Sequence, residues 1–182
     1  GLQAQDGSDL EQWFFAKMYA AGKGRGRYEK ERVKMGLGAD NGEPLSFWSD
    51  WETLVWAFPH DAKLPQLAQL VQGDRVSRLI EASPSAVGLT AGSQLIDVQC
   101  ARVKYVPGKR CVLRFGVEVD GAERPFQFYS KTFSNSQSRY VYDTLRTVRA
   151  SLGTVAGHFE IPPLLAHFDD LHTFWQAEWS GV

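Results

Sequence analysis

The lysine at position 131 stands among aromatic side chains in the segment 126–133, FQFYSKTF. Its pattern predicts a β-strand, in which alternation places Lys131 on the same face as Tyr129 and Phe133. A lysine ammonium is a compact point charge that can hold phosphate oxygens. The segment therefore predicts an anion site near the end of a strand. The alternative is an edge lysine that reaches solvent past Phe133.

A tight turn lies upstream of this strand, at Val106-Pro107-Gly108-Lys109. Such a turn can present backbone N–H groups and a cation to phosphate, and Gly108 allows close approach and positive φ. The alternative is a Pro-Gly hairpin turn of type II, which needs no ligand.

The elements that would carry these residues fill the second half of the chain. Alternation along Cys111–Val119 predicts a strand with one buried face, and Asp120-Gly121 predicts a hairpin. After the strand that holds Lys131, Ser134 is the expected cap of a helix that runs to about Leu152, ahead of Gly153. Two further strands are predicted, near 164–168 and 173–179. The expected order from residue 91 is three strands, a helix and two strands.

The sequence of the first half of the chain predicts mostly helices. Ser8-Asp9-Leu10-Glu11 has the form of a capping box, and Leu10, Phe14, Met18 and Ala21 follow at helical spacing. Residues 21–34 (AGKGRGRYEKERVK) have two interpretations: a glycine-rich phosphate or nucleic-acid loop, or a solvated linker, which we favour because no hydrophobic strand precedes it. A buried strand is predicted at 53–58, with helices near 61–71 and 74–82. We place a domain boundary near residue 90 and see no internal repeat in the sequence.

Composition limits the classes of function. The chain has 182 residues, a net charge of −1 and 43% hydrophobic content, and its pI is about 6.5. Nothing in the overall charge points to nucleic acid or membrane. No apolar run reaches the ~20 residues of a membrane-spanning helix, and the N-terminus lacks a signal-peptide pattern. We expect a cytoplasmic protein.

The cysteines and histidines do not suggest a metal site. Cys100 and Cys111 fall on neighbouring strands about four residues out of register, roughly 13 Å apart, which is too far for a disulfide. They have no Cys-x-x-Cys spacing. His60, His158, His167 and His172 show no metal-ligand spacing either, and no Ser-His-Asp arrangement can be argued from their positions.

The order of elements, with its lysine on the third strand, resembles the N-terminal lobe of the protein-kinase-like fold, and in particular the aminoglycoside phosphotransferase-like family of small-molecule kinases. The resemblance rests on residues 105–115 (YVPGKRCVLRF), 129–133 (YSKTF), 141–145 (VYDTL) and 164–181 (LLAHFDDLHTFWQAEWSG). It implies an α+β fold: a kinase-like N-lobe at 91–182, with a five-stranded antiparallel sheet and one long helix. A mostly helical extension at 1–90 would precede the lobe.

The resemblance also implies site residues. Lys131 would hold the α- and β-phosphates of ATP, and the turn with Pro107, Gly108 and Lys109 would cover the phosphates. The hinge that binds adenine would be formed by Glu178, Trp179 and Ser180. An acid on the helix usually holds the lysine in such lobes. The only acid on this helix, Asp143, lies about 200° from Val141 and from the stripe that Leu145, Val148 and Leu152 continue, so it falls on the opposite face.

The implied function is the nucleotide-binding lobe of an ATP-dependent phosphotransferase that acts on a small hydroxyl-bearing molecule. Mg²⁺, the catalytic acids and the acceptor pocket would belong to a C-terminal lobe, so no catalytic residue is expected in this chain. The lobe alone would bind ATP weakly, and its exposed face, near Trp175 and Trp179, could self-associate. The alternative is a non-catalytic, pseudokinase-like interaction module.

Overall fold

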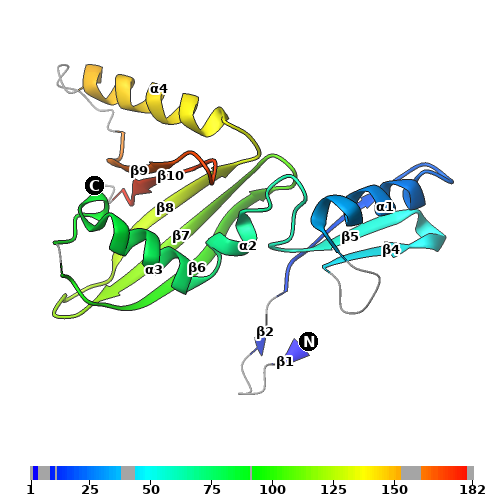
Figure 1. Cartoon of the computed structure of the whole chain (residues 1–182), viewed down its shortest axis with the longest axis horizontal. Helices are drawn as coiled ribbons and strands as arrows, with labels where there is room; N and C mark the ends of the chain where they lie inside the picture. The colour runs from blue at the N-terminus through cyan, green and yellow to red at the C-terminus, as the bar shows by residue number, and fades with distance from the viewer. Residues whose placement is uncertain are drawn as a thin grey trace. The chain divides into compact units, whose positions relative to one another are not determined.

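The computed structural model describes residues 2–3, 9–10, 12–37, 44–90, 92–152 and 161–179. Two compact units divide the chain after Pro65, so the boundary expected near residue 90 lies inside the second unit. The chain is α+β, with helices and antiparallel sheets in both units (Figure 1). None of the described helices is long and apolar enough to cross a membrane.

The first unit contains a three-stranded antiparallel sheet with one helix on it. Its elements are β1 (Leu2–Gln3), β2 (Asp9–Leu10), β3 (Phe14–Met18), α1 (Gly24–Met35), β4 (Leu45–Trp48), the 3₁₀ turn η1 (Ser49–Trp51) and β5 (Thr53–Ala57). The sheet order is β3-β5-β4. Its core is formed by Leu45, Leu54 and Trp56, against which Tyr28 and Met35 of α1 pack.

Two expectations for this unit were wrong. The apolar residues Phe14 and Met18 lie on a strand, not a helix, and the segment expected to be a linker is helix α1. Ser8 and Glu11 of the expected capping box lie outside the described residues. The short segment Phe14–Met18 fits both periods because it places an apolar residue at every position except Lys17. The strand at Thr53–Ala57 is confirmed.

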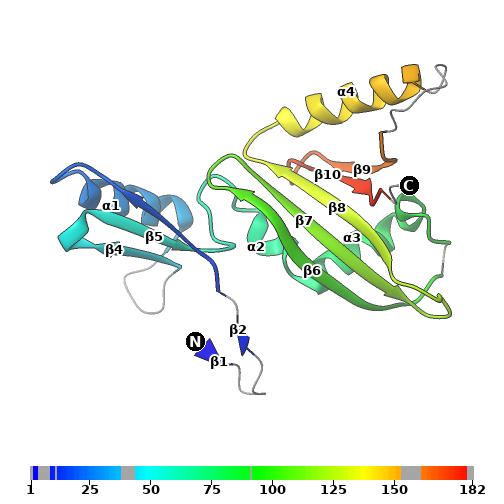
Figure 2. The ribbon, with the colours of Figure 1, turned by 180° about the vertical axis from the view of Figure 1, so that it is seen from behind.

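The second unit is built on a five-stranded antiparallel sheet of order β6-β7-β8-β10-β9 (Figure 2). Its strands are β6 (Leu95–Val106), β7 (Arg110–Val119), β8 (Phe126–Phe133), β9 (Leu164–Phe168) and β10 (Thr173–Ala177). Its helical elements are α2 (Leu67–Leu70), α3 (Gly73–Ala82), η2 (Pro84–Val87) and α4 (Gln137–Leu152). The predicted order of three strands, a helix and two strands is confirmed.

The two faces of this sheet have different covers. One face carries the fully buried residues Phe115, Phe128 and Trp175, and α3 packs along β6 with Val76 and Ile80 buried. The opposite face is covered by α4 only over β8, β9 and β10 (Figures 1 and 2). The β7 residues on that second face, Val112, Arg114, Gly116 and Glu118, are accordingly half-buried or exposed.

Helix α4 begins three residues after the expected cap. Ser134 precedes the helix, which starts at Gln137, and the side chain of Asn135 accepts a hydrogen bond from the Gln137 N–H at 3.0 Å. An asparagine carbonyl does here what a capping hydroxyl would do. Gly153, the expected C-cap, lies outside the described residues.

Each unit contains one copy of an internal structural repeat, which the sequence analysis did not predict. Residues 14–35 correspond without a gap to residues 128–149, and residues 46–57 correspond to residues 166–177. We call these pairs of segments the first copy and the second copy. Each copy is a strand, a helix and two strands, with the last strand in the middle.

The pairing register of the two copies is the same. The first and last strands pair as Phe14–Ala57, Phe15–Trp56, Ala16–Val55, Lys17–Leu54 and Met18–Thr53 in the first copy. In the second copy they pair as Phe128–Ala177, Tyr129–Gln176, Ser130–Trp175, Lys131–Phe174 and Thr132–Thr173. All five pairs occupy corresponding positions, so the register repeats to the residue.

Local details repeat as well. Glu52 and His172 are equivalent, and they are the two described non-glycine residues with positive φ, at 46° and 45°. Tyr28 stacks on Phe47 as its counterpart Tyr142 packs on His167. An ion pair of 3.5 Å joins residues three apart on each helix, Glu29–Arg32 and Asp143–Arg146. The identical residues at equivalent positions are Phe14/Phe128, Lys17/Lys131, Arg25/Arg139, Tyr28/Tyr142, Arg32/Arg146, Asp50/Asp170, Thr53/Thr173 and Ala57/Ala177.

Candidate functional site

Lys131 lies on the sheet face that α4 partly covers. Along β8 the residues Phe128, Ser130 and Thr132 are buried, while Tyr129 and Lys131 alternate with them on the other face and are half-buried. This confirms the face predicted for Lys131. Tyr142 of α4 approaches the Phe174 ring at 5.8 Å between centroids, and Lys131 Nζ lies 5.8 Å from the centroid of the same ring. The lysine and the helix therefore share one side of the sheet.

Lys131 is held by an amide. Its Nζ donates to Oε1 of Gln176 at 2.6 Å, and Nε2 of Gln176 donates to the carbonyl of Pro162 at 3.3 Å. The second bond fixes the orientation of the amide, so the carbonyl oxygen faces the ammonium. Burial lowers the pKa of Lys131 because its charged form loses solvation. Among the described residues, no carboxylate lies within 4.0 Å of this ammonium.

A second polar group lies beside Lys131 and joins three strands. Glu178, just after β10, accepts from the Tyr129 hydroxyl at 3.3 Å and pairs with Arg114 of β7 at 3.1 Å. Arg114 also donates to Gln127. The carboxylate expected at a hinge thus fastens the end of β10 to β7 and β8. Trp179 beyond it is 55% exposed, and Ser180 lies outside the described residues.

The turn predicted at 106–109 is present between β6 and β7. The N–H of Lys109 donates to the carbonyl of Val106 at 3.0 Å, and Gly108 has φ of +67°. With Pro107 ahead of a positive-φ glycine, this is the pattern of a type II turn. The Lys109 N–H is already used within the turn, while its side chain is exposed. Phosphate oxygens would therefore meet the Lys109 ammonium rather than its backbone.

Asp143 does not reach Lys131. Its carboxylate pairs with Arg146 on the same helix at 3.5 Å. The side of α4 that meets the sheet contains Ser138 and Tyr142, while Val148 is 41% exposed. The helix is therefore rotated relative to the apolar stripe expected from the sequence, and this rotation does not bring an acid to the lysine.

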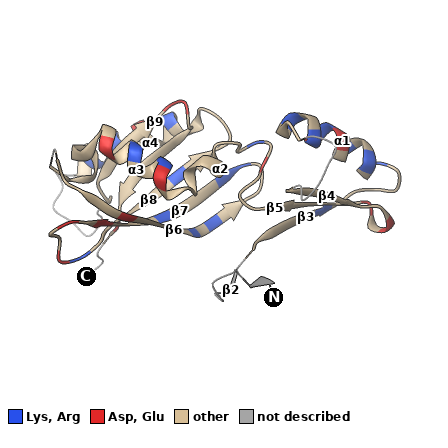
Figure 3. Ribbon diagram, turned by 60° about the horizontal axis from the view of Figure 1, so that its bottom comes forward, with Lys and Arg blue, Asp and Glu red and all other residues tan. Residues whose placement is uncertain are grey.

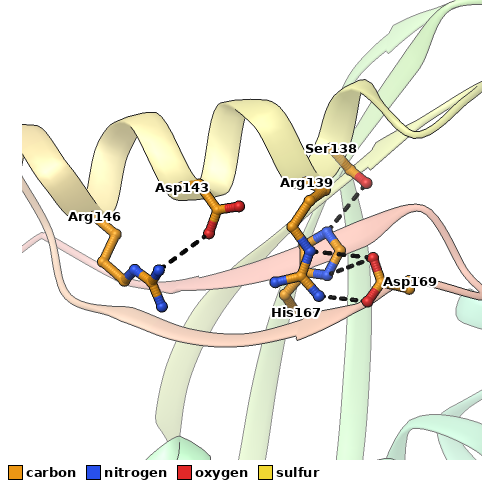
Figure 4. A network of polar contacts seen from close by, with 6 residues as sticks. All are labelled: Ser138, Arg139, Asp143, Arg146, His167 and Asp169. Carbon is orange, nitrogen blue, oxygen red and sulfur yellow. Dashed lines mark hydrogen bonds and ion pairs between the residues drawn. The ribbon is translucent and has the colours of Figure 1, made fainter.

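A polar network that was not predicted from the sequence fastens α4 to the sheet (Figure 4). His167 of β9, with a side chain only 2% exposed, contacts the Ser138 hydroxyl through Nε2 at 3.2 Å, and its Nδ1 lies 3.5 Å from Asp169. Arg139 donates from Nε to the same carboxylate at 3.2 Å. Desolvation first, and then the nearby Arg139 cation, lower the pKa of His167.

This network has the residue types of a Ser-His-Asp triad, but its position argues for structure. Ser138 is fully buried, so its hydroxyl is closed to a substrate. The residues come from a helix and a strand 29 positions apart, a separation that no sequence spacing rule would connect. Ser138 and His167 come together only because α4 packs on β9.

The cysteines and acids give no metal centre in the described part of the chain. Cys100 and Cys111 do not form a disulfide with each other, because Cys100 pairs with Phe115 and Cys111 with Tyr105 across the hairpin. Burial raises the pKa of Cys100 to about 11, so its thiol is protonated at neutral pH. No described group of three His, Cys, Asp or Glu side chains could hold a metal ion.

Comparison of the chain with protein-family models, with curated proteins and with solved structures found no significant match.

Proposed function

We propose that residues 91–182 form the nucleotide-binding lobe of an ATP-dependent phosphotransferase that acts on a small hydroxyl-bearing molecule in the cytoplasm. The observation that carries the proposal is the sheet order β6-β7-β8-β10-β9, with α4 inserted after the third strand and Lys131 on the face that α4 covers. This arrangement supports a kinase-like N-lobe.

In this lobe, Lys131 would hold the α- and β-phosphates of ATP. Its lowered pKa and its single amide partner leave an ammonium whose charge is not neutralised by a carboxylate. A phosphate group would supply the missing negative charge, and the exposed Lys109 at the β6–β7 turn would add a second cation. Mg²⁺ and the acceptor-binding acids would come from a C-terminal lobe.

The amide partner also favours a second candidate, a non-catalytic module that uses the lobe as a scaffold. Gln176 stands where Lys131 would otherwise find an acid, and Asp143 is engaged by Arg146. Without an acid partner, the lysine has no fixed ion pair that positions it for phosphoryl transfer. Under this second hypothesis the lobe would bind nucleotide poorly and would catalyse no phosphoryl transfer.

The repeat provides a matched control for the lysine. Lys131→Met and Lys17→Met remove the same side chain at equivalent strand positions, and Lys17 lies on an exposed strand of the first unit. In the protein encoded by the complete gene, we expect Lys131→Met to lower ATP consumption with hydroxyl acceptors by at least about a hundredfold. Lys17→Met should leave it within about twofold.

A labelling experiment tests the nucleotide site without an acceptor. An acyl-phosphate derivative of ATP transfers its acyl group to a lysine next to the bound phosphates, and peptide mapping identifies that lysine. We expect label on Lys131, none on Lys17, and protection by excess ATP. Label spread evenly over surface lysines, or ATP consumption unaffected by Lys131→Met, would refute the nucleotide-binding lobe.

A further inference from the structure

Basic side chains are concentrated on α1 and on the residue that precedes it, Lys23. Residues 23–34 contain six basic and two acidic side chains, and Figure 3 shows the basic positions along this helix. Four of them recur at intervals of four, three and four residues, which places them on one stripe of a helix. We call this the basic stripe: Lys23, Arg27, Lys30 and Lys34.

The basic stripe points away from the sheet. The side of α1 that packs on the first unit's core contains Gly24, Tyr28 and Met35. At 100° per residue, the four basic positions lie between about 200° and 260° from Tyr28. All four are exposed. The helix is therefore fixed by its inner side and presents the stripe to solvent on a rigid support.

Most of the stripe is not neutralised by neighbouring acids. Glu29 pairs with Arg32, and Glu31 pairs with Lys34 at 3.5 Å. Among the described residues, no carboxylate lies within 4.0 Å of Lys23, Arg27 or Lys30. Three adjacent cations on one exposed helix side repel each other, so they raise the energy of the free protein until an anion screens them.

The second copy shows that the fold does not need these charges. The residues of α4 at the four equivalent positions are Gln137, Val141, Thr144 and Val148. Both helices nevertheless dock on their sheets through an equivalent tyrosine, Tyr28 or Tyr142. The stripe is thus a property of the first copy alone and is not explained by helix formation or packing.

We infer that the basic stripe of α1 binds the phosphate backbone of a nucleic acid without sequence specificity. The stripe is linear and spans 12 residues, about 16 Å from first to last along the helix axis, which matches a run of about five phosphates on one strand. The overall charge of the chain led us to expect no nucleic-acid partner. The inference differs because the positive charge is local to this segment, and because the segment is a helix rather than a linker.

A membrane fits this surface less well. Helices that lie in a bilayer interface insert an apolar side next to their basic side. The apolar side of α1 is occupied by its own sheet through Tyr28 and Met35, and Val33 is the exposed large hydrophobic residue on this helix. An anionic bilayer would therefore gain only weak electrostatic contact.

The experiment measures binding of the full 182-residue chain to a fluorescent single-stranded oligonucleotide of about 20 nucleotides by anisotropy, over about 50 to 200 mM salt. Contacts to three or four phosphates predict an affinity loss of roughly twentyfold to fiftyfold over this range, since each contact contributes about −0.7 to the log–log slope. A duplex of the same length should show a somewhat steeper salt dependence, since each phosphate contact then contributes about −0.9 to the slope.

The test variant is Lys23→Gln/Arg27→Gln/Lys30→Gln, and the matched control is Arg78→Gln/Arg124→Gln/Arg149→Gln. Both remove three positive charges from exposed positions, but the control removes them from the second unit. We expect the test variant to reduce the slope by about two, while the control leaves it unchanged. If the test variant fails to fold by circular dichroism, Lys30→Gln alone should reduce the slope by about 0.7.

Three outcomes would overturn the inference. The wild type could show no binding at low salt, or the two triple variants could lose binding equally. Alternatively, vesicles of phosphatidylcholine with phosphatidylserine, or polyglutamate, could compete more strongly than the oligonucleotide and depend on the same three side chains. The last result would assign the stripe to a membrane or to an acidic protein segment instead.

Discussion

The two copies share one backbone design but differ in the residues around their equivalent lysines. Lys131 is surrounded by Tyr129 and Gln176, whereas Lys17 has Phe15 and Trp56 at the same register positions. Phe15 and Trp56 stack at 5.2 Å between centroids and belong to the apolar core region of the first unit. The second copy has polar side chains there, and Lys131 Nζ donates to one of them.

This difference separates two reasons for a lysine on the strand. The position itself suits a long side chain that lies over an aromatic ring, since Lys17 Nζ is 5.2 Å from the Tyr19 ring and Lys131 Nζ is 5.8 Å from the Phe174 ring. Such a contact needs no ligand. What distinguishes Lys131 is its desolvation and its fixed amide partner, so the case for a site rests on the neighbours rather than on the lysine.

The two copies also differ in how deeply they bury the sheet face that lies away from the helix. Phe128 is fully buried in the second copy, but its counterpart Phe14 is 61% exposed, and Met18 is 73% exposed where Thr132 is buried. In the second unit, α3 packs along β6 and α2 packs against α3. The buried residues of these two helices are Leu67, Leu70, Val76 and Ile80. No described element of the first unit supplies a comparable layer. The first copy therefore keeps the strand pairing and helix docking of the second without its second layer.

The largest expected effect comes from Gly24, a buried residue at the start of α1. A Cβ built there would lie 2.6 Å from the Phe47 ring and 3.0 Å from the backbone oxygen of Glu52. Gly24→Ala should therefore destabilise the first unit by about 1–3 kcal/mol, because the helix must shift away from the backbone. Hydrogen exchange read by mass spectrometry in peptides of residues 14–57 measures the loss of protection.

The equivalent position in the second copy is the control. Ser138 already has a buried side chain, and its hydroxyl contacts His167. Ser138→Ala removes only that hydrogen bond, for about 1 kcal/mol, and the effect should appear in peptides of residues 128–177. Equal losses from both substitutions would show that the two helices do not approach their sheets differently.

The next effect in size is a pH dependence that should belong to the second copy alone. The folded state lowers the pKa of His167 through burial and Arg139, while Asp169 and Asp143 oppose the shift and His172 adds to it. Because the unfolded histidine binds a proton more readily, its stabilisation is complete above about pH 6.5 and is lost as the pH falls below that value.

His167→Phe places the first copy's residue, Phe47, at the equivalent position. We expect the protection of α4 amides to fall between pH 7 and pH 5 in the wild type by more than in the variant, with the remaining histidines and acids common to both. Hydrogen exchange corrected for the intrinsic pH dependence of the rate provides the measurement. Identical profiles in the two proteins would show that His167 does not couple α4 docking to pH.

Much of the second unit follows from sequence patterns. The alternation of Cys111, Leu113 and Phe115, the short loops and the long helix determine the strands and their order, because one buried face leaves a single register. The face of Lys131 follows from the same alternation. The rotation of α4 could not be predicted, since a 16-residue helix with scattered apolar residues has more than one candidate stripe. Tyr142 and Ser138 carry the docking.

The first unit was harder to predict because local signals conflict. Phe14 and Met18 satisfy a helical spacing as well as a strand, and tertiary pairing with β5 decides between them. The glycines and charges of residues 21–34 suggest a loop, yet Tyr28 and Met35 hold the segment as a helix against the sheet. The repeat was invisible because its identical residues are few and scattered. It becomes clear only when the register of both copies is known.

The smallest expected effect concerns the two left-handed residues that end the equivalent turns. His172 and Glu52 each adopt φ near +45°, a conformation that glycine reaches without strain. His172→Gly should stabilise the second copy by about 0.5–1 kcal/mol, since relief of strain exceeds the entropy that glycine adds to the unfolded chain.

Glu52→Gly is the control and should not stabilise the first copy. The Glu52 carboxylate accepts a hydrogen bond from the Gly24 N–H at 2.5 Å at the start of α1, and losing such a cap costs about 1 kcal/mol. Hydrogen exchange in the two sets of peptides compares both variants. Equal stabilisation by both would mean that this carboxylate contributes nothing to α1, and that Tyr28 and Met35 alone hold the helix on its sheet.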